Sequence, residues 1–137
     1  MKISKVLNPD SSRKERITNE LWKHNGSFHP VEIEQFILES LDDKGTLQAG
    51  LIAQTWWGAL EIQYLWVSEQ MRGKGCGKKL VLEAEALALE RNCHMAYVDT
   101  FNFQARNFYQ KLNYKEYGSL AGYARKFERH YLSKLLK

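Results

Sequence analysis

The stretch that decides the fold reads Gln70-Met71-Arg72-Gly73-Lys74-Gly75-Cys76-Gly77-Lys78-Lys79. Residues 62–67, just before it, are rich in β-forming side chains and predict a strand. After it, apolar residues between 80 and 88 recur at the spacing of one helix face. The glycine-rich stretch therefore joins a strand to the N-terminus of a helix.

This joining stretch is suited to hold an anion. Its alternating glycines let backbone N–H groups converge without interference from Cβ atoms, and the helix dipole favours negative charge at that end. The stretch has no acidic residue, and four cationic side chains add charge to the backbone cradle: Arg72, Lys74, Lys78 and Lys79. We expect a phosphate or pyrophosphate group to bind here.

The spacing of the glycines excludes two common phosphate loops. A Walker loop needs four residues between its glycines and then Lys-Ser/Thr, and a dinucleotide fingerprint needs G-x-G-x-x-G. The stretch reads instead as R-x-x-G-x-G, with Arg72, Gly75 and Gly77 following a strand that ends in Leu65-Trp66-Val67. This pattern resembles the pyrophosphate loop of the GNAT family of N-acetyltransferases, which bind acetyl-CoA there.

A second segment, residues 97–114, makes the resemblance more specific. It is similar to the family's strand, N-x-x-A-x-x-F-Y helix and following aromatic residue, with the motif falling on Asn102, Ala105, Phe108 and Tyr109. The resemblance covers roughly the C-terminal two-thirds of the chain, from residue 56 onward. Asn113 departs from the family's usual glycine after the helix, but asparagine tolerates the left-handed conformation of a helix C-cap.

The predicted fold is α/β, with one domain over residues 1–137. The resemblance implies the acyl-CoA N-acyltransferase (GNAT) fold, a mixed, mostly antiparallel central sheet with helices on both faces. It also implies that strands 56–67 and 95–100 splay apart to admit pantetheine. Patterning and turn signals predict helices up to about residue 23, at 77–91 and at 104–112, and strands at 36–41, 46–55, 56–67, 95–100, 114–117 and 126–132.

The resemblance also implies which residues bind acetyl-CoA. The strand backbone would pair with pantetheine, and a bulge there would point an N–H, best assigned to Leu65, at the acetyl oxygen. Asn102 would hydrogen-bond the cofactor arm or cap the following helix. The predicted cofactor-binding residues are Leu65, Trp66, Val67, Arg72, Gly73, Lys74, Gly75, Cys76, Gly77, Lys78, Asn102 and Tyr109.

Two residues are candidates for proton transfer. Tyr109 matches the family tyrosine near the CoA sulfur, where a phenol can protonate the leaving thiolate; its spacing from Ala105 and Leu112 also suits a core tyrosine on an apolar helix face. Glu61 lies six residues before Val67, a spacing at which some members carry their base. Strand alternation places Glu61 on the face of Leu65 if no bulge intervenes. The alternative for Glu61 is an ordinary exposed strand residue, with proton removal through water.

The sequence therefore predicts an acetyl-CoA-dependent N-acetyltransferase that acts on a primary amine, with small molecules favoured over protein amino groups. A catalytically inert acyl-CoA-binding module is the alternative from another class. A nucleic-acid-binding domain is a third reading of the net charge of +4, but no nucleic-acid-binding motif accompanies it, so no nucleic-acid partner is expected.

Composition indicates the number of domains, the cellular location and the role of the cysteines. The 137 residues, 44% hydrophobic and 26% charged, suit one globular domain. No apolar run approaches the roughly 20 residues of a membrane span, and no signal-peptide core appears, so we expect a cytoplasmic protein without a membrane partner. Cys76 and Cys93 lack metal-type spacing, so free thiols and no metal are expected. The sequence is compatible with a homodimer but does not require one.

Overall fold

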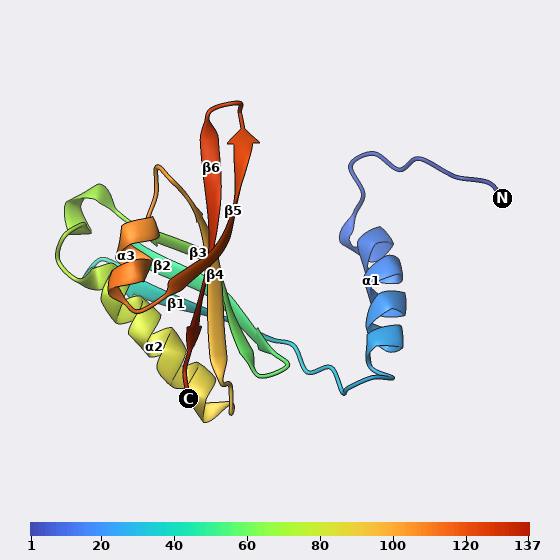
Figure 1. Ribbon diagram of the computed structural model, residues 1–137, viewed down its shortest axis with the longest axis horizontal. Helices are drawn as coiled ribbons and strands as arrows, with labels where there is room; N and C mark the ends of the chain where they lie inside the picture. Colours follow the sequence, from blue (N-terminus) through green and yellow to red (C-terminus); the bar gives the residue numbers. More distant parts are fainter. The chain divides into compact units, whose positions relative to one another are not determined.

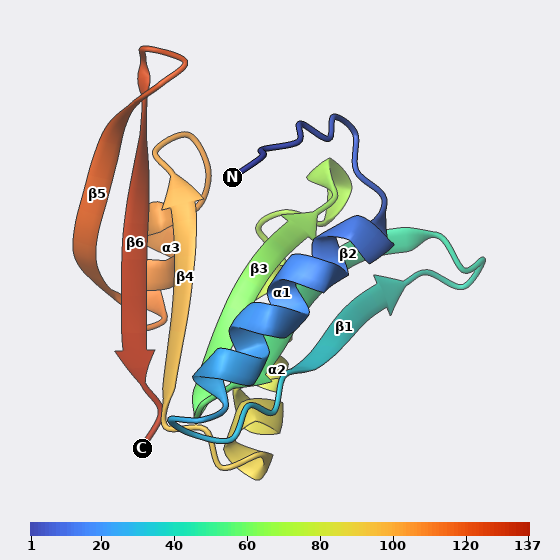
Figure 2. The ribbon, with the colours of Figure 1, turned by 90° about the vertical axis from the view of Figure 1, so that its right-hand side faces the viewer.

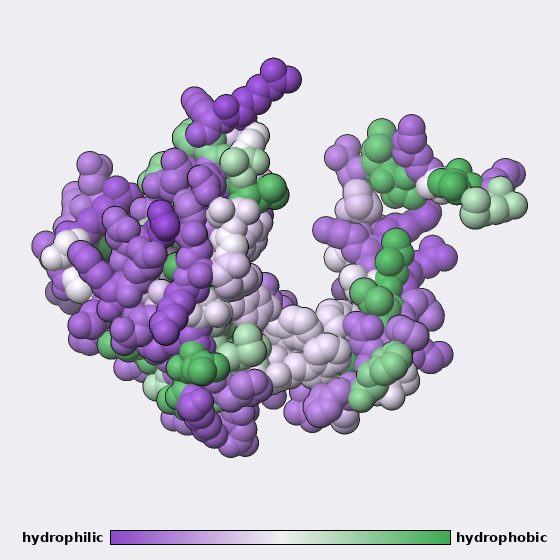
Figure 3. Space-filling view, in the orientation of Figure 1, coloured by the Kyte–Doolittle hydropathy of each residue, from purple (hydrophilic) through white to green (hydrophobic).

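The computed structural model describes residues 1–137, which form two compact units, Met1–Glu32 and Ile33–Lys137. The first unit contains helix α1 (Ser11–Asn25), close to the predicted limits. The Asp10 carboxylate accepts a hydrogen bond from the Arg13 backbone N–H at 2.9 Å, which caps the helix and lowers the pKa of Asp10. The unit exposes apolar side chains among polar ones, including Ile17, Leu21 and Phe28 (Figure 3).

The second unit is built on one six-stranded sheet in the order β1-β2-β3-β4-β6-β5 (Figures 1 and 2). Neighbouring strands are antiparallel except β3 and β4, which are parallel. The sheet is therefore mixed and mostly antiparallel, as predicted. Its strands are β1 (Glu34–Leu41), β2 (Leu47–Trp56), β3 (Ala59–Val67), β4 (Met95–Phe101), β5 (Lys115–Tyr123) and β6 (Phe127–Leu135).

Two helices of this unit, α2 (Cys76–Glu90) and α3 (Arg106–Lys111), lie on one face of the sheet. The apolar side chains of α2 are buried against β2 and β3, and Tyr109 and Leu112 join the same core. A short 3₁₀ turn, Glu69–Met71, leads from β3 towards α2. None of the helices combines the length and hydropathy needed to cross a membrane.

The sequence favours a turn at residues 42–45 and another near residues 57 and 58, and both turns are present. The Asp42 carboxylate accepts hydrogen bonds from the backbone N–H groups of Lys44 and Thr46, at 2.8 and 2.9 Å, and so closes the β1–β2 turn. At the β2–β3 turn, Trp57 and Gly58 both have positive φ, at 49° and 74°. This is the backbone of a tight primed hairpin turn, whose twist matches that of the strands.

Two elements differ in length from the prediction. Helix α3 begins at Arg106 rather than Gln104, because the Gln104 side chain bonds back to the end of β4. The β5–β6 hairpin is longer than predicted, and its strands cover 115–123 and 127–135. The segment 118–122 contains two glycines, a serine and an alanine, a composition typical of a turn. The sequence pattern therefore does not predict a strand there.

A buried polar network ties α2 to the far strands. The Tyr114 hydroxyl donates to a Glu85 oxygen at 2.8 Å, and the Lys134 ammonium lies 2.9 Å from the other oxygen. The Glu85 side chain is only 9% exposed. Burial and the adjacent Glu85 charge raise the pKa of Tyr114, so this phenol stays a hydrogen-bond donor. The network satisfies a carboxylate that is otherwise expensive to bury.

We predict that Glu85→Ala lowers the free energy of unfolding by about 3 kcal/mol, because it leaves the Lys134 ammonium and the Tyr114 hydroxyl without their shared partner. Urea unfolding followed by tryptophan fluorescence measures the change. Glu83→Ala, on the same helix at an exposed position, is the matched control and should change stability by less than about 0.5 kcal/mol. Equal losses in the two variants would contradict the assigned role of the network.

Candidate functional site

The site begins where β3 and β4 part. The two strands pair over only four residues each, Ala59–Ile62 with Met95–Val98, and Figure 2 shows them diverging from there. In the same region β3 has a bulge, because Ile62 and Tyr64 pair with successive residues of β2 and Gln63 is left over. A bulge bends a strand and increases its twist. The predicted splay is thus present, and the bulge lies at its start.

The parting leaves backbone groups of β3 without β4 as a partner. Leu65, Trp66 and Val67 pair with β2 on one side only. Successive N–H and C=O groups of a strand point to alternate sides, so some of those in residues 65–67 face the opening. A bound chain can pair with these groups as a further strand would.

A cleft of about 1030 Å³ lies beside this opening. It is bordered by β3, by the glycine-rich loop and by the start of α3. Ten of the twelve predicted cofactor-binding residues line it, and Lys74 and Tyr109 do not: the lining includes Leu65, Trp66, Val67, Arg72, Gly73, Gly75, Cys76, Gly77, Lys78 and Asn102. Other lining residues that the sequence analysis did not assign include Met71, Phe103, Gln104, Arg106 and Lys111.

The glycine-rich loop presents backbone N–H groups to the cleft. Gly73 and Gly75 have φ values of 76° and 80°, in the region that favours glycine. The Lys79 N–H bonds back to the Gly75 carbonyl at 3.1 Å, so the first N–H groups of α2 have no partner within the helix. Together with the helix dipole and the Arg72 and Lys78 side chains, these groups have the chemistry to bind an anion.

Gly77 fixes how closely the loop approaches its neighbours. A Cβ atom at this position would lie 3.3 Å from the Phe108 ring and 3.5 Å from the Val67 side chain. The absence of a side chain therefore lets the first turn of α2 pack directly against both α3 and β3. The three walls of the cleft meet at this contact.

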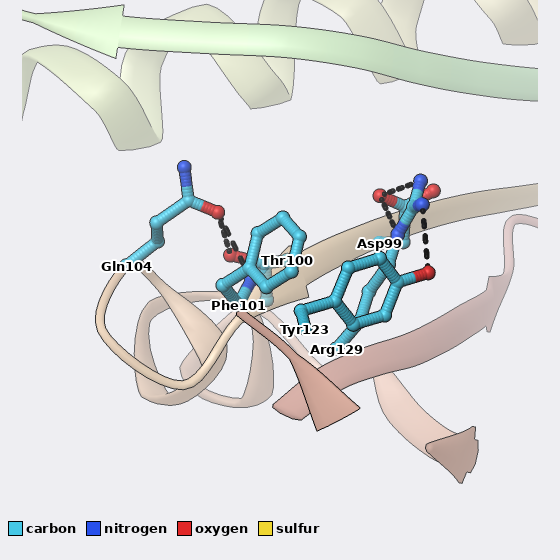
Figure 4. Close-up of polar contacts among 6 residues, drawn as sticks. All are labelled: Asp99, Thr100, Phe101, Gln104, Tyr123 and Arg129. Carbon is cyan, nitrogen blue, oxygen red and sulfur yellow. Dashed lines mark hydrogen bonds and ion pairs between the residues drawn. The ribbon is translucent and has the colours of Figure 1, made fainter. Parts of the chain in front are cut away.

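The wall formed by the start of α3 is held by side chains of β4 and the following loop. The Thr100 hydroxyl accepts from the Ala105 N–H at 3.2 Å, and the Gln104 side-chain oxygen accepts from the Phe101 N–H at 2.9 Å (Figure 4). Arg106 forms an ion pair with Glu116 at 2.9 Å. These contacts fix the backbone that borders the cleft.

Asn102 does not cap α3 by the expected contact. Its side-chain oxygen accepts from the Glu128 N–H at 3.1 Å, and its own N–H donates to the Glu128 carbonyl at 3.0 Å. The helix starts four residues later, at Arg106. Asn102 therefore ties the cleft wall to β6 while it lines the cleft, and the capping interpretation was wrong.

Tyr109 lies in the core beneath the cleft, 4% exposed, with its ring edge-on to Phe108 and Tyr114. Burial raises the pKa of its hydroxyl, and the Asp99 charge raises it further. Asp99 is the first residue of β4 beyond its pairing with β3. The phenol is thus within electrostatic reach of the point where the strands part, and it stays protonated at neutral pH.

Glu61 lies on the other face of the sheet. Ile62, Leu65 and Val67 pack on the core, and the bulge at Gln63 switches the alternation between Glu61 and Leu65. The two side chains therefore point to opposite faces, contrary to the alternation expected without a bulge. The Glu61 carboxylate accepts a hydrogen bond from the Gln54 side chain at 2.8 Å and stands beside Tyr97 of β4.

The sequence analysis did not identify a second charged residue on this face, Arg129. Arg129 of β6 contacts one Asp99 oxygen through two nitrogens, at 2.9 and 2.7 Å, and the Tyr123 hydroxyl at 3.4 Å (Figure 4). Its guanidinium also lies over the rings of Phe101, Tyr123 and Tyr131. Alternation along β4 puts Tyr97, Asp99 and Phe101 on one face, but only the β4–β6 register brings Arg129 to them.

Comparisons with known proteins agree with this geometry. The model of a family described as the acetyltransferase (GNAT) family matches residues 6–114. Blasticidin-S acetyltransferase of Streptomyces morookaense is 34% identical over 105 residues, which cover 76% of this chain and 77% of that protein.

Two solved structures are similar to the whole chain. An acetyltransferase from Bacillus cereus ATCC 14579 is 29% identical, with a TM-score of 0.83 over 96% of this chain and 97% of that one. An aminoglycoside 6'-N-acetyltransferase complexed with coenzyme A is 17% identical, with a TM-score of 0.66 over 100% of this chain and 98% of that one. The second likeness concerns the fold alone.

Proposed function

Because the chain belongs to the acetyltransferase (GNAT) family, whose general reaction transfers the acetyl group of acetyl-CoA, we propose that its acceptor is a primary amine of a small molecule. The observation that carries the proposal is the cleft beside the parted strands, which ends at the anion site of the glycine-rich loop. The similarity to blasticidin-S acetyltransferase over 77% of that protein supports a small-molecule acceptor.

The residues present fit acetyl-CoA. The pyrophosphate would lie on the N–H groups at the start of α2, with Arg72 and Lys78 as side-chain donors. The backbone of residues 65–67 would pair with pantetheine where β4 has left it. Asn102 and Phe103 would border the opposite side. When bound, the thioester supplies the activated acetyl group.

We further propose that both units belong to one acetyltransferase domain. The family match, residues 6–114, runs across the boundary between Glu32 and Ile33. Cys76 and Cys93 are free thiols, which suits the reducing cytoplasm that the sequence predicted.

The two faces of the sheet supply the proton chemistry in this proposal. Tyr109, on the core side, is the acid that protonates the departing thiolate, and its protonated state at neutral pH suits that role. Glu61, on the opposite side, takes the proton of the acceptor ammonium, either directly or through one water. The pairing of β3 with β4 ends at Ile62, one residue beyond Glu61, so Glu61 stands beside the opening, whereas Tyr109 lies beneath the cleft on the core side.

The open face also favours a cationic acceptor. It carries two carboxylates, of which Asp99 is paired with Arg129 at 2.7 Å, so Glu61 supplies the negative charge beside the ring of Tyr97. Negative charge attracts an ammonium group before deprotonation, and aromatic faces bind cations with about 0.5–1 kcal/mol at exposed sites. An amine acceptor therefore suits this surface better than a neutral alcohol.

A panel of acceptors tests the proposed function. Blasticidin S, polyamines, amino acids, aminoglycosides and peptides are each assayed for CoA release from acetyl-CoA. We expect turnover with at least one small amine and little with peptides. Turnover with peptides alone would overturn the small-molecule assignment, and binding of acetyl-CoA without any turnover would favour an inert acyl-CoA-binding module.

We predict that acetyl-CoA raises the melting temperature of the protein and that Gly75→Val removes this shift. A ligand at a hundred times its Kd stabilises the folded state by about 2.7 kcal/mol, whereas a side chain at Gly75 strains the loop at its φ of 80°. Gly45→Val is the matched control, since Gly45 has a φ of 81° in the β1–β2 turn. Loss of the shift in both variants, or in neither, would contradict the proposed site.

We predict that Tyr109→Phe lowers kcat about a hundredfold and leaves the KM for acetyl-CoA nearly unchanged, because the phenol acts on charge that develops on the leaving sulfur. Steady-state kinetics with the best acceptor measures both constants. Tyr117→Phe, at an exposed position of β5, is the control. An unchanged kcat in Tyr109→Phe would leave this residue as a core side chain and assign the proton to water.

We predict that Glu61→Gln lowers kcat/KM at neutral pH about a hundredfold, since the amide keeps the shape of the side chain but accepts no proton. Activity should recover in part as pH rises, because more of the acceptor amine is then already neutral. The pH–rate profiles of both proteins measure the effect. Superimposable acidic limbs and equal plateaus would show that Glu61 does not carry the proton.

A further inference from the structure

Three neighbouring strands bring polar side chains together around Glu61. On one side Glu61 pairs with Gln54 of β2, and on the other with Tyr97 of β4. Paired residues of adjacent strands project to the same face, and Trp56 lies two residues beyond Gln54 on that face. Glu61 therefore has a hydrogen-bonding neighbour on each side, one residue before the strands part.

The contacts among these side chains form a directed chain. The Trp56 indole N–H donates to the Tyr97 hydroxyl oxygen at 3.0 Å. Because an indole is only a donor, the Tyr97 oxygen is the acceptor there and its own proton is free to be donated. Glu61 pairs with Tyr97 across β3 and β4, so its carboxylate is the neighbouring acceptor to which that proton can be donated.

The protonation state of the Tyr97 hydroxyl depends on its burial and on the neighbouring Glu61 and Trp56 side chains. Burial, together with the Glu61 charge and hydrogen bond, raises the pKa of Tyr97 to about 12, although the bond from Trp56 lowers it. Tyr97 therefore remains a neutral donor throughout the pH range in which an acetyltransferase works. Tyr117 is the further titratable group that interacts with Tyr97, and Asp99 is the next charged residue on this face of β4.

The Glu61 carboxylate accepts a hydrogen bond from Gln54 at 2.8 Å, and Tyr97 stands beside it on the other strand as a second potential donor. A free glutamate side chain loses rotamer entropy when it is held in one orientation, and donors on both sides offset that cost before substrate arrives. A carboxylate has about four lone-pair sites, so two donors leave room for an ammonium or a water.

We propose that Tyr97 is a positioning residue for Glu61, held by Trp56, and that it aims the carboxylate at the acceptor amine beside the β3–β4 opening. The inference rests on the proposed role of Glu61 as the base. In the proton-transfer step the N–H bond of the acceptor ammonium breaks and an O–H bond forms on Glu61, while Tyr97 keeps its own proton.

The test combines Tyr97→Phe with Glu61→Gln in a double-mutant cycle. We expect Tyr97→Phe to lower kcat about tenfold, since a hydrogen bond to a charged group is lost, with the KM for acetyl-CoA unchanged. The acidic limb of the pH–rate profile should move to higher pH, because the carboxylate loses a donor that favours its charged form. In the Glu61→Gln background the same substitution should have no further effect.

Three other outcomes of this cycle are possible, and each contradicts one part of the proposal. If Glu61→Gln is impaired but Tyr97→Phe has wild-type kinetics and an unmoved acidic limb, the positioning role falls and the base assignment stands. An equal loss in both backgrounds shows that Tyr97 acts independently of Glu61. If Glu61→Gln has wild-type kinetics, the base assignment falls, and the Tyr97 inference falls with it.

A second variant keeps the test decisive if Tyr97→Phe unfolds. Trp56→Phe removes the donor that orients the Tyr97 hydroxyl and keeps an aromatic ring in place. We expect a smaller shift of the acidic limb in the same direction. No shift in Trp56→Phe would overturn the part of the proposal that has Trp56 hold Tyr97.

Discussion

The early parting of β3 from β4 is the constraint on which the rest of the site depends. Parallel strands joined by a helix would pair along their full length if nothing prevented it, but here pairing stops after Ile62 and Val98. The bulge at Gln63 bends β3 at that point. Backbone groups that would complete a sheet are left for a ligand, and the two faces of the sheet are connected through the opening. The cleft, and with it the proposed placement of acid and base, follows from this one irregularity.

The opening is useful only if the glycine-rich loop is held against it. Gly77 provides this connection, because its missing side chain lets α2 approach Phe108 and Val67 at van der Waals distance. Farther along α2, Glu85 binds Tyr114 and Lys134 in the core. The N-terminus of α2, with its unpaired N–H groups, is thereby fixed relative to β3. A rigid anion site next to open strand backbone is more selective for a long ligand with a charged end than either feature alone.

The sequence predicted the parts of the site that are local in the chain. The R-x-x-G-x-G loop and the motif around Tyr109 are recognisable because the chemistry of each lies within a few residues. The surroundings of Glu61 were not predictable, because they depend on strand register and on a bulge that adds one residue to β3. The capping role of Asn102 was predicted wrongly for a similar reason. Its actual partner, Glu128, is 26 residues away in the sequence, in a hairpin whose length could not be predicted because small residues lie near its tip.

The proposed arrangement of acid and base on opposite faces has a physical advantage. Two proton-transfer groups that share one cavity perturb each other's ionisation, as neighbouring carboxylates do. Here the sheet separates Tyr109, buried among aromatic rings, from Glu61, which is held among polar donors. The phenol then keeps its proton at neutral pH, as the step proposed for it requires. The proposed chain from Trp56 through Tyr97 extends this separation, since the Tyr97 hydroxyl beside Glu61 is a donor whose own proton stays in place at neutral pH.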